Sequence, residues 1–141
     1  PVQQYVPAWT IFGMFLIMIP IAGIFVKERE QGITQRLAVA PVPKSFFLLA
    51  RIVTFVFINM TQLFLMLSLG VFILPFLGLK ALNVSGHIIP IAISGLFISL
   101  AATGFGVLLG TYSKTFEQTM ALGPTLIVIG AAIGGIMAPL Y

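Results

Sequence analysis

The chain has 141 residues, of which 60% are hydrophobic and 7% are charged. A soluble domain carries about 25% charged residues, so this composition excludes a water-exposed surface and places the chain in a lipid bilayer. The net charge of +4 arises from seven basic and three acidic side chains, which are too sparse for a nucleic-acid partner and indicate an orientation signal for membrane insertion. Because the sequence has no cysteine, it excludes disulfides and thiolate metal sites in this segment.

Four hydrophobic segments follow one another along the chain. Each can form a helix that crosses a hydrocarbon core of about 30 Å, which takes roughly 20 residues. They are apolar on every face, which favours helices over the alternating strands of a barrel. We therefore predict an all-α integral membrane protein with four transmembrane helices. Residues 1–141 are expected to be one transmembrane domain cut from a longer chain, with spans at about 6–26, 52–79, 88–112 and 120–141.

The connectors between these spans differ in charge, and this difference predicts their sides of the membrane. If residues 27–51 are cytoplasmic, residues 113–118 are cytoplasmic as well and residues 80–87 are external. Six of the seven basic residues then lie on the cytoplasmic side and Lys80 lies outside. This is a strong positive-inside bias, which supports the orientation.

Proline, glycine and capping residues predict where the spans bend, meet and begin. Pro20 should kink the first span near its inner end, because it removes a backbone hydrogen bond and crowds the preceding turn. Thr115 and Gln118 fit a capping box that starts the fourth helix. Two glycine pairs with a spacing of four can let another helix approach closely. They are Gly106 with Gly110 and Gly130 with Gly134.

Charge is concentrated in the first connector, since six of the ten charged side chains lie between Lys27 and Lys44. A basic loop that only sets topology explains the positive residues there. It does not explain Glu28 and Glu30. The other interpretation is a docking element for a water-soluble partner.

The same connector contains signals for a short helix. Gly32 can end the helix that leaves the membrane, and Thr34 can cap a new helix that reaches about Ala40, before Pro41 ends it. Spacings of four and three produce an apolar stripe along one side. So short a helix is not stable alone and needs a surface to lie on. The stripe consists of Ile33, Leu37 and Ala40.

The stretch "EREQGITQRLAVAPV" resembles the cytoplasmic signature of the type-2 ATP-binding-cassette exporter permeases. In that family a proline follows the motif and a basic residue opens the next span, here Arg51. The sequence departs from the pattern at Ile33 and Thr34, where Thr-Leu is more usual. The flanks "VPAWTIFGMF" and "EQTMALGP" resemble the second and fifth spans, so the likeness covers nearly the whole chain. The matching positions are Glu28, Arg29, Glu30, Gly32, Arg36, Leu37 and Pro41.

The resemblance implies six helices in each half of a transporter, two halves around a pore, and a cytoplasmic ATPase bound to each half. Residues 1–141 are then spans two to five, and the connector is the element that couples them to the ATPase. Charged side chains can bond that partner, and Ile33 and Leu37 can anchor it. The residues expected to couple are Glu28, Arg29, Glu30, Gly32, Thr34, Arg36, Leu37 and Pro41.

Other chemistry is sparse in this sequence. No G-x-x-x-x-G-K-[ST] motif is present, so we expect ATP and Mg to bind in the partner ATPase and no enzyme activity, cofactor or metal site in this chain. No ionisable residue lies deep in a span, which counts against an ion-driven carrier. His87 is expected to be a solvated loop residue. Asn59 and Gln62 share one face of the second span and either bond other helices or line a translocation path.

Together with these patterns, the resemblance implies that the chain is the membrane-spanning permease subunit of an ATP-driven exporter. It would move a hydrophobic or amphipathic substrate, such as a drug, a lipid or a lipid-linked glycan, out of the cytoplasm. The expected location is the bacterial inner (plasma) membrane. The expected partners are a cytoplasmic ATP-binding cassette ATPase, a second permease copy of the same or a different kind, and membrane lipid. The alternative is a non-transporting membrane scaffold whose basic connector recruits a cytoplasmic protein.

Overall fold

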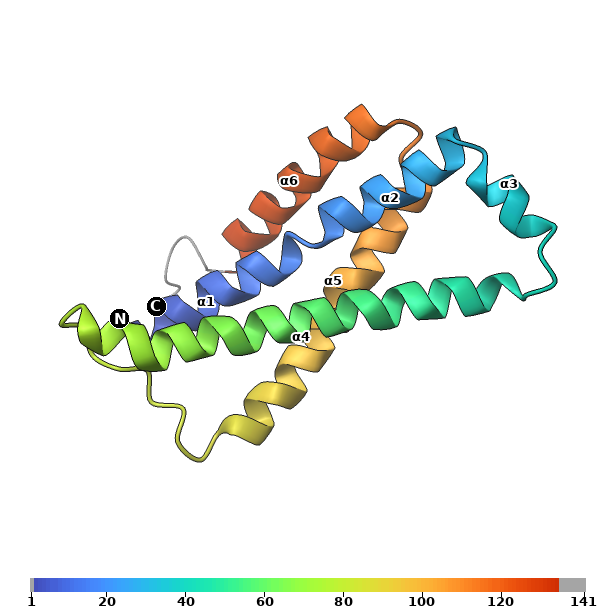
Figure 1. The fold of residues 1–141 in the computed structure, drawn as a ribbon. Coiled ribbons are helices and arrows are strands. Elements are labelled where there is room, and N and C mark those ends of the chain that lie inside the picture. Colours follow the sequence, from blue (N-terminus) through green and yellow to red (C-terminus); the bar gives the residue numbers. More distant parts are fainter. Residues whose placement is uncertain (1, 135–141) are drawn as a thin grey trace.

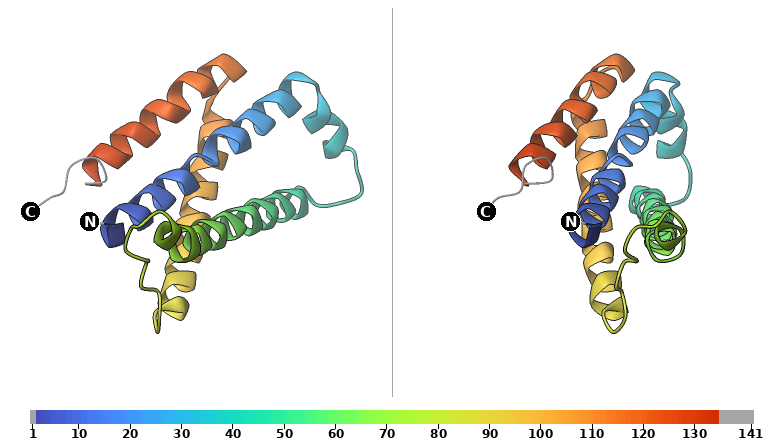
Figure 2. Two further views of the ribbon diagram at one scale, coloured as in Figure 1. Left: turned by 60° about the vertical axis from the view of Figure 1, so that its left-hand side comes forward. Right: turned by 90° about the vertical axis from the view of Figure 1, so that its left-hand side faces the viewer.

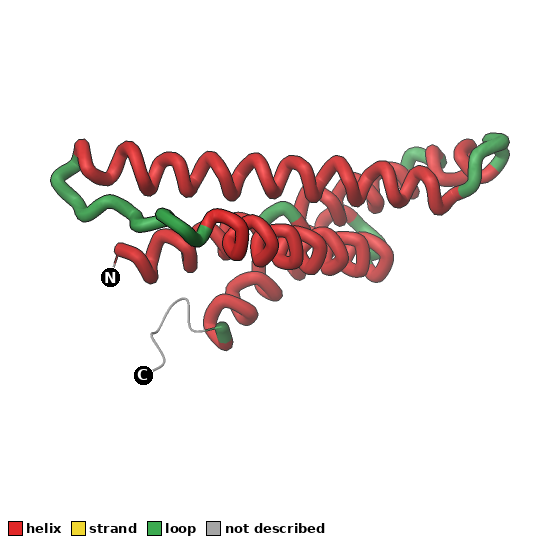
Figure 3. The backbone as a smooth tube through the Cα atoms, turned by 90° about the horizontal axis from the view of Figure 1, so that it is seen from below, coloured by secondary structure: helices red, strands yellow, loops and turns green. Residues whose placement is uncertain are grey.

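The computed structural model describes residues 2–134, which form six α-helices and no strand (Figures 1 and 3). Four stretches are long and apolar enough to cross a membrane, with α1 and α2 counted as one. The predicted all-α membrane fold is confirmed. The helices are α1 (Val2–Phe15), α2 (Met18–Glu30), α3 (Ile33–Ala38), α4 (Lys44–Phe76), α5 (Ile88–Tyr112) and α6 (Phe116–Ile133).

The first span is broken between α1 and α2, at Leu16 and Ile17. Pro20 has no N–H to donate to the carbonyl of Leu16, four residues earlier, and its ring crowds that turn. The Leu16 carbonyl instead accepts a hydrogen bond from the Ile19 N–H at 3.2 Å. The kink predicted at Pro20 is confirmed, but it lies near the middle of the span, because α2 continues to Glu30, beyond the predicted inner end.

The second span is longer than the sequence predicts. α4 begins at Lys44 instead of residue 52, and it ends at Phe76 instead of residue 79. Pro43 is extended and stops the helix from starting earlier, whereas no residue from Lys44 to Arg51 breaks a helix. The 33 residues of α4 have a length of about 50 Å, which exceeds a hydrocarbon core of about 30 Å. Much of the predicted connector 27–51 is therefore helical.

The third and fourth spans are closer to expectation. α5 has the predicted bounds, Ile88–Tyr112. α6 begins at Phe116, as the predicted cap at Thr115 requires and before the apolar span expected from residue 120. The Thr115 hydroxyl accepts a hydrogen bond from the Gln118 N–H at 3.2 Å. The predicted cap at Thr115 is confirmed, and the return bond of Gln118 differs by one residue: its side-chain oxygen accepts a hydrogen bond from the Lys114 N–H at 2.9 Å instead of from Thr115. The predicted end of this span, residues 135–141, lies outside the described residues.

α2 packs against both α5 and α6 (Figure 1). A Cβ atom added at Gly106 would lie 3.0 Å from the Met18 Cα, and one added at Gly110 would lie 3.0 Å from the Ala22 Cα. The two backbones therefore touch, which confirms the close approach predicted for this glycine pair. No such approach occurs at Gly130, where an added Cβ atom would meet no other helix of the described residues within 4 Å, and the atoms near Gly134 are carbonyls of α6 itself. The buried side chains that join the three helices are Met18, Ala22, Leu109 and Ile127.

α4 is arranged differently from the other spans. Its second half lies beside α1, and its first half leans away from α2 toward the end of the molecule that carries α3 (Figures 1 and 2). α5 crosses α4 steeply, with Leu63 of α4 packed on Gly95 of α5. We call the end that carries α3 the connector end. There the axes of α2 and α4 diverge, and α3 with its flanking turns connects them along the chain (Figure 1).

Candidate functional site

The connector end is built around the short helix α3. Gly32 precedes it with a φ of 70°, a left-handed conformation that glycine adopts without a steric penalty. Gly32 therefore occupies the N-cap position, and Thr34 lies inside the helix without a capping bond. The predicted capping by Thr34 is wrong, because the reversal at Gly32 starts the helix at Ile33. The helix ends at Ala38, before Pro41.

The side chains of α3 and the following turn divide into two groups. The residues of the predicted apolar stripe are half-buried, which leaves part of each side chain accessible: Ile33, Leu37 and Ala40. The opposite side is exposed and consists of Thr34, Gln35 and Arg36. No residue of α3 is fully buried, and Val39 is 85% exposed. With Glu30 and Pro41 also exposed, the connector presents polar and apolar groups outward.

Glu28, in the last turn of α2, forms an ion pair with Arg51 of α4. Arg51 donates two hydrogen bonds, from Nη1 to Oε2 at 2.9 Å and from Nη2 to Oε1 at 2.5 Å. Bidentate pairs of this kind are among the stronger charged contacts. The two side chains are 22% and 23% exposed, and the Arg51 guanidinium lies 4.7 Å from the centre of the Phe25 ring. Within the described residues this is the one ion pair, and it joins α2 to α4.

Arg29 contacts a different helix. Its Nη2 donates to the Gly110 carbonyl at 2.6 Å, and its Nη1 donates to the Ser113 carbonyl at 3.1 Å. These carbonyls lie at the C-terminus of α5, where C=O groups lack partners inside the helix and the helix dipole is negative. The ammonium of Lys27 lies 4.6 Å from the centre of the Phe116 ring in α6. Three consecutive charged residues of α2 therefore reach α6, α4 and α5 in turn.

These contacts separate the predicted coupling residues into two groups. Glu28 and Arg29 hold the ends of α4 and α5, whereas the exposed residues Glu30 and Arg36 have no such contact in the described part of the chain. Sequence reasoning expected all four to serve a partner and missed the intramolecular role of the first two. A partial signal was Arg51, a basic residue at the same expected membrane boundary as Glu28.

The two polar residues singled out in the second span point into the bundle, as predicted. Asn59 is fully buried, and neither side-chain atom of its amide has a hydrogen-bond partner among the described residues. Leu63, one turn further along α4, packs on Gly95 of α5. A Cβ atom added at Gly13 of α1 would lie 3.0 Å from Nε2 of the half-buried Gln62. Asn59 thus lies where α4 meets both α1 and α5.

An apolar cavity of about 580 Å³ lies between α1, α2, α5 and α6. No charged side chain lines it, and no group of three potential metal-binding side chains occurs anywhere in residues 2–134. Aromatic and aliphatic side chains form its walls, which suits a hydrophobic guest. They include Phe12, Phe15, Met18, Phe105, Leu126 and Ile127.

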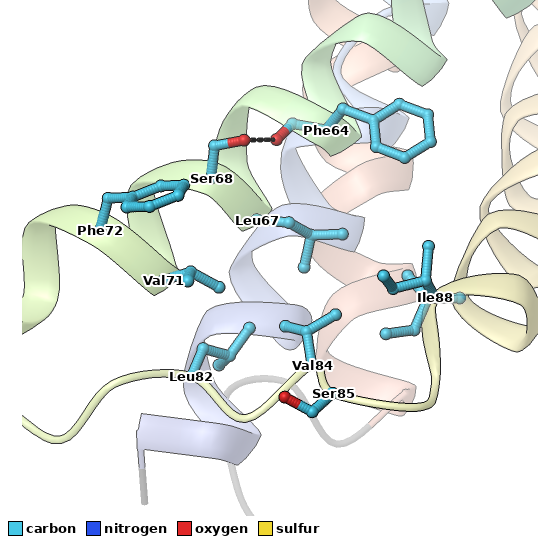
Figure 4. Close-up of a pocket in the computed structure, with 10 residues that line it drawn as sticks. Phe64, Leu67, Ser68, Val71, Phe72, Leu82, Val84, Ser85 and Ile88 are labelled. Carbon is cyan, nitrogen blue, oxygen red and sulfur yellow. Dashed lines mark hydrogen bonds between the residues drawn. The ribbon is translucent and has the colours of Figure 1, made fainter.

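At the opposite end of the molecule, the loop of residues 77–87 folds back onto α4. The Leu82 N–H donates to the Gly70 carbonyl at 3.3 Å, and the Leu82 side chain is buried. Figure 4 shows Leu82 and Val84 pointing toward α4 across a cavity of about 310 Å³. His87 is exposed, as expected of a solvated loop residue.

Comparison with known proteins adds one finding to this geometry. No curated protein and no solved structure matched the chain. A family model described as ABC-2 family transporter protein matches residues 2–140, a range that contains all six helices. The resemblance stated from the connector motif is confirmed. The chain therefore belongs to the ABC-2 family of transporter proteins, as a multi-pass membrane permease subunit of an ATP-binding-cassette transporter.

Proposed function

We propose that this chain is the membrane-spanning part of an exporter that moves a hydrophobic or amphipathic substrate out of the cytoplasm. Family membership implies pairing with a cytoplasmic ATP-binding cassette subunit. The observation that carries the proposal is α3, a short helix between Gly32 and Pro41 that projects from the spans without one fully buried residue. A six-residue helix is not stable alone, so α3 is built to fit a surface.

In this proposal the connector end faces the cytoplasm, as the bias of basic residues supports. Glu30 and Arg36 are exposed and can form charge-assisted bonds to the ATPase, and Leu37 supplies an apolar anchor. ATP and Mg bind in that ATPase, where hydrolysis takes place. The reversal at Gly32 and the turn before Pro41 keep α3 at a defined angle, so that a movement of the ATPase reaches the spans.

The kind of substrate follows from the interior of the bundle. The 580 Å³ cavity falls within the range of about 300–1,000 Å³ that small-molecule sites occupy, and its walls are apolar. A drug, a lipid or a lipid-linked glycan has the chemistry for such a site. Asn59 and Gln62 are the polar candidates for the path, since the Asn59 amide has no partner among the described residues. We place the transporter in the bacterial inner membrane, with a second permease copy completing the pore.

The partner can be identified by a cross-link from α3. Gln35 is exposed on the polar side of the helix, and the sequence has no cysteine, so Gln35→Cys provides a single reactive thiol in a cysteine-free full-length protein. A short thiol-to-amine reagent in intact membranes, followed by mass spectrometry, should attach an ATPase that carries a phosphate-binding loop. Lys80→Cys, exposed at the opposite end, is the matched control and should not attach it. Attachment at Gln35 to lipid, to a second copy or to a protein without nucleotide-binding features would favour the scaffold.

The apolar anchor provides a second test. Leu37→Ala should lower the ATP hydrolysis of the assembled complex at least about fivefold, because it weakens the contact through which the spans and the ATPase influence each other. Insertion and yield should not change, since Leu37 is only half-buried. Leu79→Ala makes the same truncation at an exposed site on the opposite end and should leave hydrolysis unaltered. Equal hydrolysis in both variants would contradict a coupling role for α3.

A further inference from the structure

The charged turn at the end of α2 holds two helices by contacts of different strength. We propose that Glu28 and Arg29 are positioning residues with separate tasks: Arg29 keeps α5 fixed to α2, and the Glu28–Arg51 pair is a latch on α4 that opens during the transport cycle. This inference rests on the proposed function and adds how a movement of α3 is divided among the spans.

The hold on α5 is continuous. The backbones of α2 and α5 touch at Gly106 and Gly110, where an added Cβ atom would lie about 3 Å from α2 atoms. Arg29 extends this contact beyond the end of the packed region, through its two bonds to the C-terminal carbonyls of α5. A helix held by both backbone packing and a charged cap has no room to shift alone. α2 and α5 are therefore expected to move as one body.

The hold on α4 at the connector end is local. Over residues 44–54 the side chains of α4 are exposed or half-buried, and none is fully buried. The specific contacts of this segment to α2 are the Glu28–Arg51 ion pair and the stacking of Arg51 on Phe25. Packing against the neighbouring helices begins one turn later, where Phe55 packs against the buried cluster that Ile17, Ile21 and Ala102 form. An ion pair that is partly open to water can be exchanged for solvent, unlike a backbone contact.

The chain geometry makes the latch directly responsive to α3. Glu28 is four residues before Gly32, where the chain reverses into α3. Arg51 is in the second turn of α4, just after the segment that returns from α3. A force on α3 therefore acts on both sides of the pair. When α3 shifts on a docked partner, α2 and α4 separate at the connector end and the Glu28–Arg51 pair breaks, while Arg29 carries α5 along with α2.

The experiment uses the full-length, cysteine-free protein in complex with the ATPase recovered through Gln35→Cys. Glu28→Cys and Arg51→Cys are introduced together and linked with a reversible bis-methanethiosulfonate reagent. Linking is measured in the nucleotide-free complex and in the complex trapped with ATP, Mg and vanadate. Arg29→Cys with Ser113→Cys is the matched control across α2 and α5.

A latch predicts that the linked fraction of the Glu28/Arg51 pair falls at least about fivefold in the trapped state, while the control pair links equally in both states. Linked complex should lose its permease-stimulated ATP hydrolysis and regain it when the link is reduced. Linking that does not depend on nucleotide, full activity of the linked complex, or an equal fall in the control pair would each overturn the latch while the proposed function stands. Failure to recover an ATPase would overturn the proposed function, and this inference with it.

Charge reversal tests the same pair without cysteines. Glu28→Arg and Arg51→Glu should each lower the stimulated ATP hydrolysis at least about fivefold, since like charges then meet at the contact. The double variant restores an opposite-charge pair and should recover most of the activity. A double variant no better than either single variant would show that the pair itself is not the latch.

Discussion

The packed unit of α2, α5 and α6 and the long helix α4 are both strongly apolar, yet they are buried to very different degrees. In the 13 residues of α2, five are buried, whereas in the 33 residues of α4 three are buried. The face of α5 that meets α2 explains the burial of α2, because Ala102, Gly106 and Gly110 are small and let the α2 backbone come close. Between helices in lipid, small residues decide which backbones meet, and hydrophobicity alone does not.

The contrast has a consequence for a transporter. α2 and α5 share a close backbone contact at Gly106 and Gly110, while α4 at the connector end is held to α2 through Arg51. Movement at the connector is therefore easier for α4 than for α5. Substitutions in the packed unit should lower the free energy of unfolding far more than substitutions in the connector do.

The largest effect is expected at the contact between α2 and α5. Gly110→Leu should lower the free energy of unfolding by about 3 kcal/mol, because even a Cβ atom there would lie 2.9 Å from the Phe25 Cβ and 3.0 Å from the Ala22 Cα. Gly104→Leu is the matched control on the same helix, since a Cβ atom added there would meet no side chain and no other helix within 4 Å in the described part of the chain. Gly104→Leu should change the free energy of unfolding by no more than about 0.5 kcal/mol, measured by thermal unfolding of the detergent-solubilised protein. Similar losses in both variants would remove the distinction between packed and free faces of α5.

A smaller loss is expected at the charged cap of α5. Arg29→Gln should lower the free energy of unfolding by about 1.5 kcal/mol, because it removes charge-assisted bonds to the Gly110 and Ser113 carbonyls at a partly exposed site. Arg36→Gln removes the same charge from the exposed side of α3 and should change the permease alone by less than about 0.5 kcal/mol. Chemical denaturation of both variants without the ATPase measures the difference between their free energies of unfolding. If Arg36→Gln proves the more destabilising, the connector is part of the fold and not a docking element.

The smallest effect, and one of opposite sign, is expected where α4 crosses α1 and α5. Asn59→Leu keeps the branching of the side chain and removes a buried amide without hydrogen-bond partners among the described residues, so it should be neutral or raise the stability by about 1 kcal/mol. Asn59→Asp has the same shape but buries a charge, and it should be strongly destabilising. Thermal unfolding of both variants measures whether each substitution raises or lowers the stability. A clear loss in Asn59→Leu would mean that the amide has a bound partner, such as an ordered water.

Local features of the structure could be read from the sequence. The kink at Pro20 and the cap at Thr115 depend on residues within one turn of each other, and both were predicted. The start of α4 was missed because Lys44 and Arg51 end the apolar run without breaking the helix. The cap at Thr34 was wrong because left-handed Gly32 already supplies the reversal. Hydropathy located the spans, and the backbone conformation at Gly32, Pro43 and Thr115 located where the helices after them begin.

By itself the sequence determined that this protein is a bundle of membrane helices with a charged connector, because lipid requires apolar side chains and internally bonded backbones. Its motif was also sufficient to indicate the family. Only the tertiary structure decided what the charges of that connector do. Neighbouring residues on a helix point about 100° apart, so Glu28 and Arg29 must face different surroundings. Which helix each one meets depends on how closely the spans pack, and that was decided by small residues more than 70 positions away in the chain, at Gly106 and Gly110.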